Sequence, residues 1–241
     1  MKLGVWLKIF RVLLGLFQGY WRLVTGFHGL TDEQKSREIE AWARNMLRIM
    51  GVQVRTQGQP ASGPVLMAAN HISWLDILVM LAASHCRFVA KADIRHWPVL
   101  GTLTTGVGSL YIARESSRDA MRVVHQMAAA LQNGDVLAVF PEGTTGDGLR
   151  LLPFHANLLQ AAISADVPIQ PIALRFVDAA TGQPSLAPCY IGDDTLVGSI
   201  WRTLTAPPLI ACVTYGKPEK AEGKTRREWA QSLHACIAAL L

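Results

Sequence analysis

Short apolar runs alternate with amphipathic segments from residue 52 to the end of the chain. Apolar runs of about four to eight residues predict buried strands, whereas apolar residues at helical spacing predict helices. We expect strands at residues 52–56, 64–70, 87–91, 109–113, 135–140, 168–176 and 209–216. We expect helices at residues 74–83, 116–134, 155–165 and 225–241. This alternation predicts an α/β fold, with a mostly parallel or mixed central sheet flanked by helices.

Two further amphipathic helices are predicted in the first fifty residues. The second of them opens on "TDEQ" at residues 31–34, which is the pattern of a capping box. The first carries a narrow polar stripe at helical spacing, made of Lys8, Arg11, Gly15, Gln18 and Arg22. Its remaining surface is largely apolar and includes Trp6, Ile9, Phe10, Leu13, Phe17 and Trp21.

A basic stripe beside a large apolar face is typical of a helix that lies in a membrane interface. The polar residues leave no uninterrupted apolar span of about 20 residues, which a transmembrane helix would need. No acidic residue precedes Asp32, and this favours contact with anionic lipids. We therefore predict a membrane-associating helical element at residues 1–50 and an α/β domain at residues 51–241. The alternative is a first helix buried tightly against that domain.

The charge of the chain narrows the classes of partner. The 241 residues carry a net charge of +5, which favours anionic partners such as membrane surfaces, phosphorylated substrates or acidic carriers. Beyond the first helix the basic residues are scattered and form no aromatic-basic platform, so a nucleic-acid partner is not expected. The four cysteines make no CxxC pair and no zinc spacing, and we expect reduced, buried thiols in a reducing compartment.

Three polar clusters follow predicted strands, at the strand ends where sites gather in α/β sheets. They are Asn70 to Asp76, Tyr111 to Arg114, and "FPEGTT" at residues 140–145. In the first cluster, His71 and Asp76 are five residues apart and can meet only if His71 lies in the turn before the helix. Asp76 would then accept a hydrogen bond from one ring nitrogen and leave the other as a base. The structural alternative is a simple helix opening, with Ser73 as N-cap and Asp76 at N3.

No covalent nucleophile accompanies this pair. The sequence has no G-x-S-x-G elbow, no metal-binding set and no P-loop or dinucleotide fingerprint. We therefore expect no metal and no cofactor. A histidine–aspartate pair without its own serine indicates that the substrate supplies the nucleophile, as an alcohol that attacks an activated acyl group.

Asn70-His71 with Asp76 resembles the first motif of the glycerolipid acyltransferases, the lysophosphatidate acyltransferase family. "GSLYIAR" at residues 108–114 is similar to the second motif of that family, and "FPEGT" at residues 140–144 matches the third. "VPIQPIAL" at residues 167–174 is similar to the fourth. The four motifs stand in the family's order, and the N-terminal helix pair resembles a membrane-docking element of some members.

The resemblance implies a role for each matching residue. His71 would be the general base on the acceptor hydroxyl, and Asp76 would orient it. Arg114 would bind the phosphate of the acceptor, as a guanidinium can with two oxygens. The other residues expected to bind the acceptor are Asn70, Ser73, Lys91, Glu142, Gly143 and Thr144. Pro168 and Pro171 would line the site for the donor or the acyl chain.

The implied reaction is transfer of a fatty acyl group from acyl carrier protein or coenzyme A to a lysolipid. Lysophosphatidate is the expected acceptor, at the cytoplasmic face of a bacterial inner membrane, with the enzyme peripheral or monotopic. Thr145 stands where many members carry arginine, and Asp93 stands where Lys-x-Glu is usual. Both departures concern the acceptor head group, so another lysolipid, such as lyso-ornithine lipid, stays open. A membrane lipid-binding protein without catalysis is the alternative outside the enzyme class.

Overall fold

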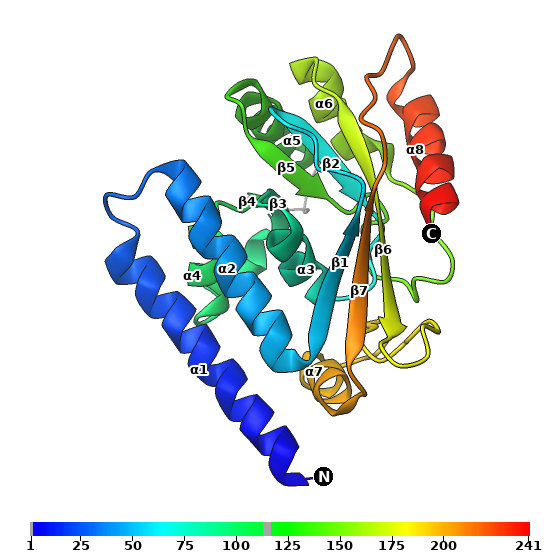
Figure 1. Cartoon of the computed structure of the whole chain (residues 1–241). Helices are drawn as coiled ribbons and strands as arrows, with labels where there is room; N and C mark the ends of the chain where they lie inside the picture. Colours follow the sequence, from blue (N-terminus) through cyan, green and yellow to red (C-terminus); the bar gives the residue numbers. More distant parts are fainter. Residues whose placement is uncertain (1, 113–116) are drawn as a thin grey trace.

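In the computed structural model, which describes residues 2–112 and 117–241, seven strands form one mixed sheet (Figure 1). The strands are β1 (Val52–Gln57), β2 (Val65–Ala69), β3 (Arg87–Lys91), β4 (Leu110–Ile112), β5 (Val136–Val139), β6 (Ile169–Asp178) and β7 (Leu209–Tyr215). Their order is β1-β7-β6-β2-β5-β3-β4. Strands β2 to β6 run parallel, whereas β7 pairs antiparallel to β6 and parallel to β1. The predicted α/β class is confirmed, and each predicted strand is present.

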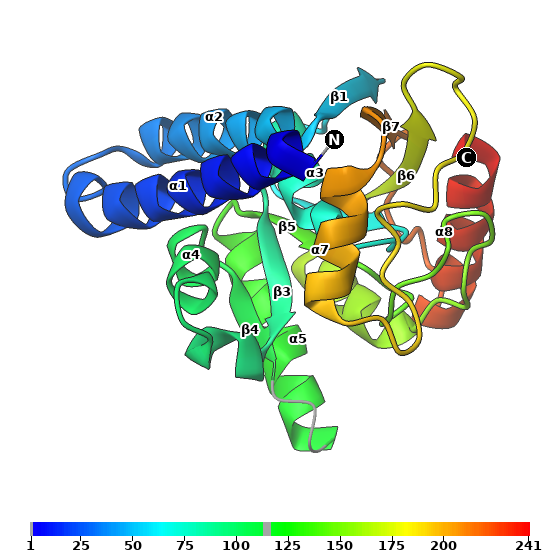
Figure 2. The ribbon, with the colours of Figure 1, turned by 90° about the horizontal axis from the view of Figure 1, so that it is seen from below.

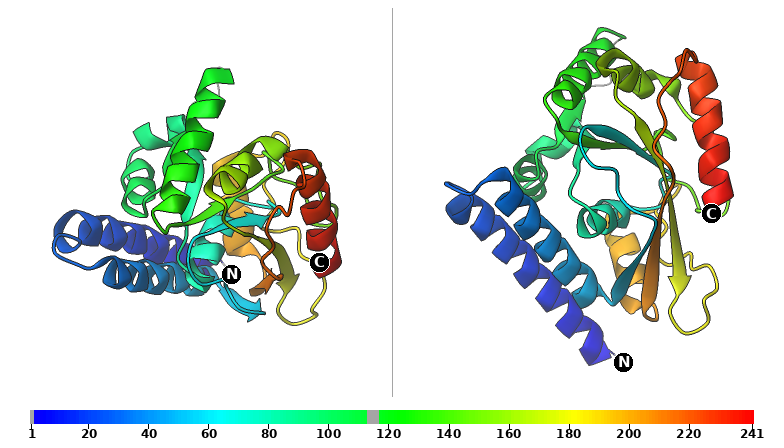
Figure 3. Two further views of the ribbon diagram at one scale, coloured as in Figure 1. Left: turned by 90° about the horizontal axis from the view of Figure 1, so that it is seen from above. Right: turned by 45° about the horizontal axis from the view of Figure 1, so that its top comes forward.

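Helices cover both faces of the sheet. They are α3 (Leu75–Ala83), α4 (Leu100–Gly106), α5 (Ser117–Gln132), α6 (Gln160–Ala165), α7 (Leu196–Thr205) and α8 (Arg226–Leu240), with 3₁₀ turns at Ala92–His96 and Ala156–Leu159. Successive residues of a strand point to opposite faces. In β2, Met67 and Ala69 therefore pack in the core beneath α3, while Leu66 and Ala68 pack beneath α5 and α8. Both views in Figure 3 show α8 on the far side of the sheet from the N-terminal helices.

The helices α4 and α7 are absent from the sequence-based prediction. Both are rich in glycine, serine and threonine, which are weak helix formers, so intrinsic helix propensity does not mark them. Packing fixes α7 instead, because its inner face buries Ser199, Thr203 and Leu204. Its start does carry a local signal, since the Thr195 side chain accepts a hydrogen bond from Gly198 N.

The first two helices, α1 (Lys2–Gly26) and α2 (Asp32–Met50), form an antiparallel hairpin (Figure 1). Two glycines of α1 allow the close approach, since a Cβ at Gly15 or Gly19 would collide with Met46 or Trp42. The Trp42 indole also donates to Gly15 O at 2.9 Å. Gly15 therefore belongs to the contact with α2, which corrects its place in the predicted polar stripe.

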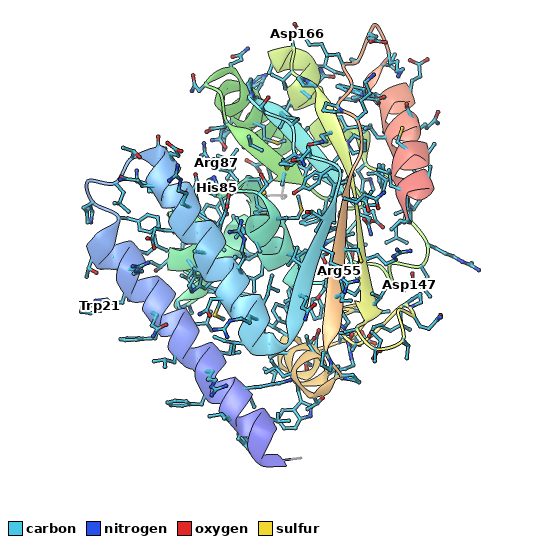
Figure 4. The ribbon with its side chains drawn as sticks, viewed as in Figure 1. Trp21, Arg55, His85, Arg87, Asp147 and Asp166 are labelled. Atoms are coloured by element: carbon cyan, nitrogen blue, oxygen red, sulfur yellow. The ribbon has the colours of Figure 1, made fainter. Side chains whose placement is uncertain are left out.

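The outer surface of α1 is apolar and exposed. Phe10 is 62% exposed and Trp21 is 58% exposed, and Figure 4 shows Trp21 projecting away from α2. A tightly buried first helix is therefore ruled out, although Ile9 does pack against the core. In the part of the chain that the structure describes, no helix is both long enough and apolar enough to cross a membrane.

Helix α2 shares the core of the sheet. Its capping box is present as predicted, with Thr31 and Gln34 exchanging hydrogen bonds. Ile39, Ala43, Met46, Leu47 and Met50 are buried in the same cluster as residues of β2 and α3. The predicted boundary at residue 50 thus separates elements that pack together, and of the two N-terminal helices it is α1 that presents a broad apolar face to the outside.

Candidate active site

Two of the three predicted polar clusters, residues 70–76 and 140–145, lie side by side at the carboxyl ends of parallel strands. Strands β2 and β5 are parallel neighbours, so the loops that follow them leave the sheet side by side. His71 N donates to Glu142 Oε1 at 2.7 Å, and Gly146 N donates to His71 O at 2.8 Å. Two loops that are more than 70 sequence positions apart are thereby joined, as expected for loops that follow neighbouring parallel strands.

His71 and Asp76 form the predicted hydrogen bond. Their Nδ1 and Oδ2 atoms are 2.8 Å apart, with Asp76 fully buried and the His71 side chain 20% exposed. Because Nδ1 faces the carboxylate, the Nε2 atom of the ring is left for another partner. The His71 ring stacks on Phe140, with centroids 3.9 Å apart and planes 10° from parallel. The imidazole is therefore held on one edge and one face.

All three hydrogen bonds that the Asp76 carboxylate accepts end on one oxygen, Oδ2. Besides His71 Nδ1, its Oδ2 accepts the backbone N–H of Ile72 at 2.7 Å and of Ser73 at 2.9 Å. Its Oδ1 is buried without a hydrogen-bond partner among the described residues. Three donors on one carboxylate oxygen fix the turn and the imidazole together.

The helix opening differs in detail from the prediction. Helix α3 begins at Leu75 with Trp74 as the N-cap, one residue later than expected, so Asp76 is not at N3. Ser73 Oγ instead accepts the N–H of Leu75 at 3.2 Å. The N–H groups of Ser73, Leu75 and Asp76 all donate within this turn. They are therefore not free to bind an oxyanion.

Glu142 joins the two loops through its carboxylate. Oε1 accepts from His71 N, and Oε2 accepts from Leu152 N at 2.8 Å. The side chain is only 4% exposed. Burial raises the pKa of Glu142, while its hydrogen bonds to the backbone of His71 and Leu152 act in the opposite direction. This geometry gives Glu142 a positioning role, because neither oxygen faces an open pocket.

Asn70 and Ser73 also hold the backbone rather than an open surface. The Asn70 side chain exchanges two hydrogen bonds with the main chain of Leu174, donating at 3.0 Å and accepting at 2.7 Å. Asn70 is 1% exposed and Ser73 is fully buried. The expectation that they touch substrate therefore has no support in their placement, since both lie beneath the site.

The remaining residues expected to bind the acceptor are Gly143, Thr144, Lys91 and Arg114. Gly143 and Thr144 are exposed in the loop beside His71, and Gly143 has a φ of 71°, which favours glycine. Lys91 ends β3, the strand next to β5, so its backbone lies at the same edge of the sheet. Arg114 lies outside the described residues.

The placement of Pro168 and Pro171 corrects their predicted role. Ala69, at the end of β2, is in register with Ile172 of β6. Pro168 therefore lies four residues, or about 13 Å, toward the opposite edge of the sheet. Pro171 is buried within β6, and its carbonyl accepts from Gly216 N at 2.8 Å. Neither proline lines the site around His71.

Helix α7 and the segment before it contact both loops of the site, which sequence analysis did not predict. Tyr190 N donates to Ile72 O at 3.1 Å, and the Thr145 hydroxyl donates to Tyr190 O. Trp74 Nε1 donates to Ser199 Oγ at 3.1 Å. Each contact crosses more than forty residues of sequence, and the two made by Tyr190 involve its main-chain atoms, so no residue pattern marks them.

Cys189 lies close enough to Asp76 for the carboxylate to act on its thiol. Burial, with a smaller contribution from Asp76, raises the pKa of its thiol to about 11. A thiol with so high a pKa is not a thiolate nucleophile at neutral pH. All four cysteines are free, although Cys212 and Cys236 are only partly buried.

Known proteins share this arrangement of motifs. The acyltransferase family model matches residues 51–175. The 1-acyl-sn-glycerol-3-phosphate acyltransferase of Neisseria meningitidis serogroup B is 36% identical over 88% of this chain and 86% of its own length. The lyso-ornithine lipid O-acyltransferase of Pseudomonas aeruginosa is 32% identical over 84% of this chain and 78% of its own length.

A solved structure shares the fold. The crystal structure of the 1-acyl-sn-glycerophosphate acyltransferase from Thermotoga maritima matches with a TM-score of 0.70. The match covers 97% of this chain and 96% of that chain at 19% sequence identity. With a family match over more than half of its length and relatives above 30% identity, this chain belongs to the acyltransferase family and is an acyltransferase enzyme.

Proposed function

We propose that the enzyme transfers a fatty acyl group from acyl carrier protein or coenzyme A to the free hydroxyl of a lysolipid. The first acceptor we propose is 1-acylglycerol-3-phosphate, and the product is then phosphatidate. One observation carries the proposal: His71 is fixed by Asp76 through Nδ1, and its other nitrogen faces no protein partner in the described residues. That arrangement fits a base that acts on a hydroxyl brought by the substrate.

The reaction then needs two proton transfers, one to His71 and one from it. His71 Nε2 takes the proton of the acceptor hydroxyl, and the oxygen attacks the thioester carbonyl. The tetrahedral intermediate collapses, the carbon–sulfur bond breaks, and the leaving thiolate takes the proton from the imidazolium. Asp76 stabilises the imidazolium that exists between the two transfers. General base catalysis of this kind typically contributes about 10²–10⁴-fold to the rate.

The acceptor is argued from the relatives and from the basic residues that the sequence motifs assign to it. The Neisseria relative is named for 1-acyl-sn-glycerol-3-phosphate, whose phosphate suits the predicted binding by Arg114 and Lys91. The Pseudomonas relative, at similar identity, is named for lyso-ornithine lipid. Lyso-ornithine lipid is therefore the second candidate acceptor, and the chemistry at His71 is the same for both.

The exposed apolar face of α1 supports a location at a membrane surface. Phe10, Phe17 and Trp21 are each more than half exposed, and no acidic residue occurs in this helix. Lysolipids partition into bilayers, so an enzyme docked there meets its acceptor at high local concentration. We propose a peripheral or monotopic enzyme at the cytoplasmic face of a bacterial inner membrane.

The test is acyl transfer by the purified protein. Labelled acyl carrier protein and acyl-coenzyme A donors are offered to lysophosphatidate and to lyso-ornithine lipid, with His71→Ala beside the wild type. His28→Ala, in the exposed turn after α1, is the matched control. We expect product from lysophosphatidate, at least a hundredfold slower with His71→Ala. Near-normal turnover by a folded His71→Ala variant would remove the mechanism, and product from lyso-ornithine lipid alone would change the acceptor.

A further inference from the structure

Helix α7 presents an apolar outer face. Val197 is 77% exposed and Trp201 is 47% exposed, one helical turn apart on the same side. The opposite side of α7 is buried, with Ser199 and Thr203 almost inaccessible. Large apolar side chains that remain this exposed on a folded domain mark an interaction surface when they are contiguous with others.

The exposed apolar side chains of the protein are unevenly distributed. Outside α1 they are found in α7 and the loop before it, in the turn into α4, and singly elsewhere: Trp97, Val99, Met121, Leu149, Leu186, Ile191, Val197 and Trp201. Among the fully described helices α2, α6 and α8, none carries such a side chain. The uneven distribution places most of these residues around the loops that follow the parallel strands.

Helices α1 and α7 form one continuous surface. The rings of Trp6 and Trp201 meet edge to face, with centroids 6.1 Å apart. Lys8 Nζ donates to Leu204 O at 3.2 Å, which fixes the amino-terminal half of α1 against the end of α7. Figure 2 shows the N-terminal end of α1 beside α7, with both helices toward the viewer. The apolar face of α1 therefore continues onto α7.

The chemistry of this surface fits a lipid bilayer. Tryptophan side chains favour the boundary between water and hydrocarbon, where an apolar ring and a polar N–H are both satisfied. Helix α1 supplies basic and no acidic residues, which complements anionic head groups. On α7, Arg202 pairs with Asp194, so that carboxylate does not oppose the lipid charge. A surface that binds a soluble protein more commonly carries both positively and negatively charged side chains.

We propose that α7 is a second membrane contact, which docks with α1 on an anionic bilayer and turns the strand ends that carry His71 toward the lipid. This rests on the proposed function, in which the acceptor is a lipid. It goes further, because the N-terminal helix alone would leave the orientation of the site undefined. The 3.1 Å hydrogen bond from Trp74 to Ser199 sets α7 directly beside the turn of His71.

The experiment is flotation of the full chain with vesicles of phosphatidylethanolamine and phosphatidylglycerol. Val197→Asp, at a side chain that is 77% exposed, is compared with Ala235→Asp, an equal charge change on the exposed side of α8. We expect Val197→Asp to weaken vesicle binding about tenfold and Ala235→Asp to leave it unchanged. Val197→Phe should tighten binding without lowering the melting temperature of the protein, which separates a gain of lipid contact from misfolding.

Three results would overturn the proposal. They are equal binding by Val197→Asp and Ala235→Asp, no gain with Val197→Phe, and a dimer in lipid-free solution that Val197→Asp dissociates. The last result would assign this surface to a second copy of the chain. Flotation requires neither donor nor acceptor, so it separates this proposal from the proposed function. A protein that docks through α7 but transfers no acyl group would refute only the latter.

Discussion

Asp76→Asn separates the charge of the catalytic turn from its geometry. All three hydrogen bonds to Asp76 end on Oδ2, while Oδ1 has no partner among the described residues. An asparagine can place its carbonyl oxygen at the Oδ2 position and keep all three donors. Its amide group then occupies the Oδ1 position, where the buried N–H donors cost about 1–3 kcal/mol of stability. The fold should survive, and only the negative charge is removed.

The expected loss of activity follows from the charge. A carboxylate and an imidazolium whose charges lie about 4 Å apart attract by about 4 kcal/mol at an effective dielectric constant of about 20. That stabilisation exists only while His71 carries the acceptor's proton, so it acts on the barrier and not on substrate binding. Since each 1.36 kcal/mol is about tenfold in rate, kcat should fall about a thousandfold with little change in KM.

The assay is steady-state acyl transfer with thermal unfolding of the same preparation. Asp76→Ala is the companion variant, because it removes the hydrogen bonds as well as the charge and should unfold at a lower temperature than Asp76→Asn. A kcat for Asp76→Asn within tenfold of the wild type, in a protein that melts normally, would refute the assigned role of the charge.

Three further substitutions test the surroundings of the site. Glu142→Gln leaves one of the two backbone N–H groups facing the N–H₂ of the new amide. This should lower the free energy of unfolding in urea by about 1.5–3 kcal/mol and should also lower kcat. An unchanged midpoint of urea unfolding would contradict this. Asn70→Ala removes both hydrogen bonds to Leu174 and should cost about 2–3 kcal/mol, with KM unchanged if Asn70 does not touch substrate. Burial lowers the pKa of His85 below 6.5, opposed by Glu40, so the unfolded chain binds more protons just below that pH. The free energy of unfolding should therefore decrease as the pH falls below 6.5, and His85→Asn should flatten this dependence; identical pH profiles would exclude His85 as its source.

The contact between His71 and Asp76 could be predicted because it is local. Five residues of separation and a helix start allow few geometries, and the strand before them fixes the edge of the sheet. The cap itself was predicted one residue too early, because Asp76 accepts the N–H groups of Ile72 and Ser73 while Ser73 Oγ accepts that of Leu75.

Contacts between segments that are distant in the sequence could not be predicted from it. Glu142 was expected at the site, but that its carboxylate holds the main chain of His71 depends on β2 and β5 being neighbours. Pro168 shows the reverse error, since the motif identified the correct strand but not which end of it faces the site. Helix α7 was missed although Leu196, Val197, Ile200, Trp201 and Leu204 fall at helical spacing, a pattern that the prediction overlooked.

The carboxylate of Glu142 has a consequence for engineering this enzyme. Because it ties the turn of His71 to Leu152, the loop after β5 is not a module that can be exchanged alone. A loop taken from a relative would have its own number of residues between Glu142 and the N–H group that stands in place of Leu152 N. Any difference in that number would move the Glu142 carboxylate, and the imidazole of His71 would move with it. Libraries aimed at a new head group should therefore vary the exposed position Thr144 and keep Gly143, whose φ of 71° favours glycine. Wholesale loop exchange would have to carry the turn after β2 as part of the same graft.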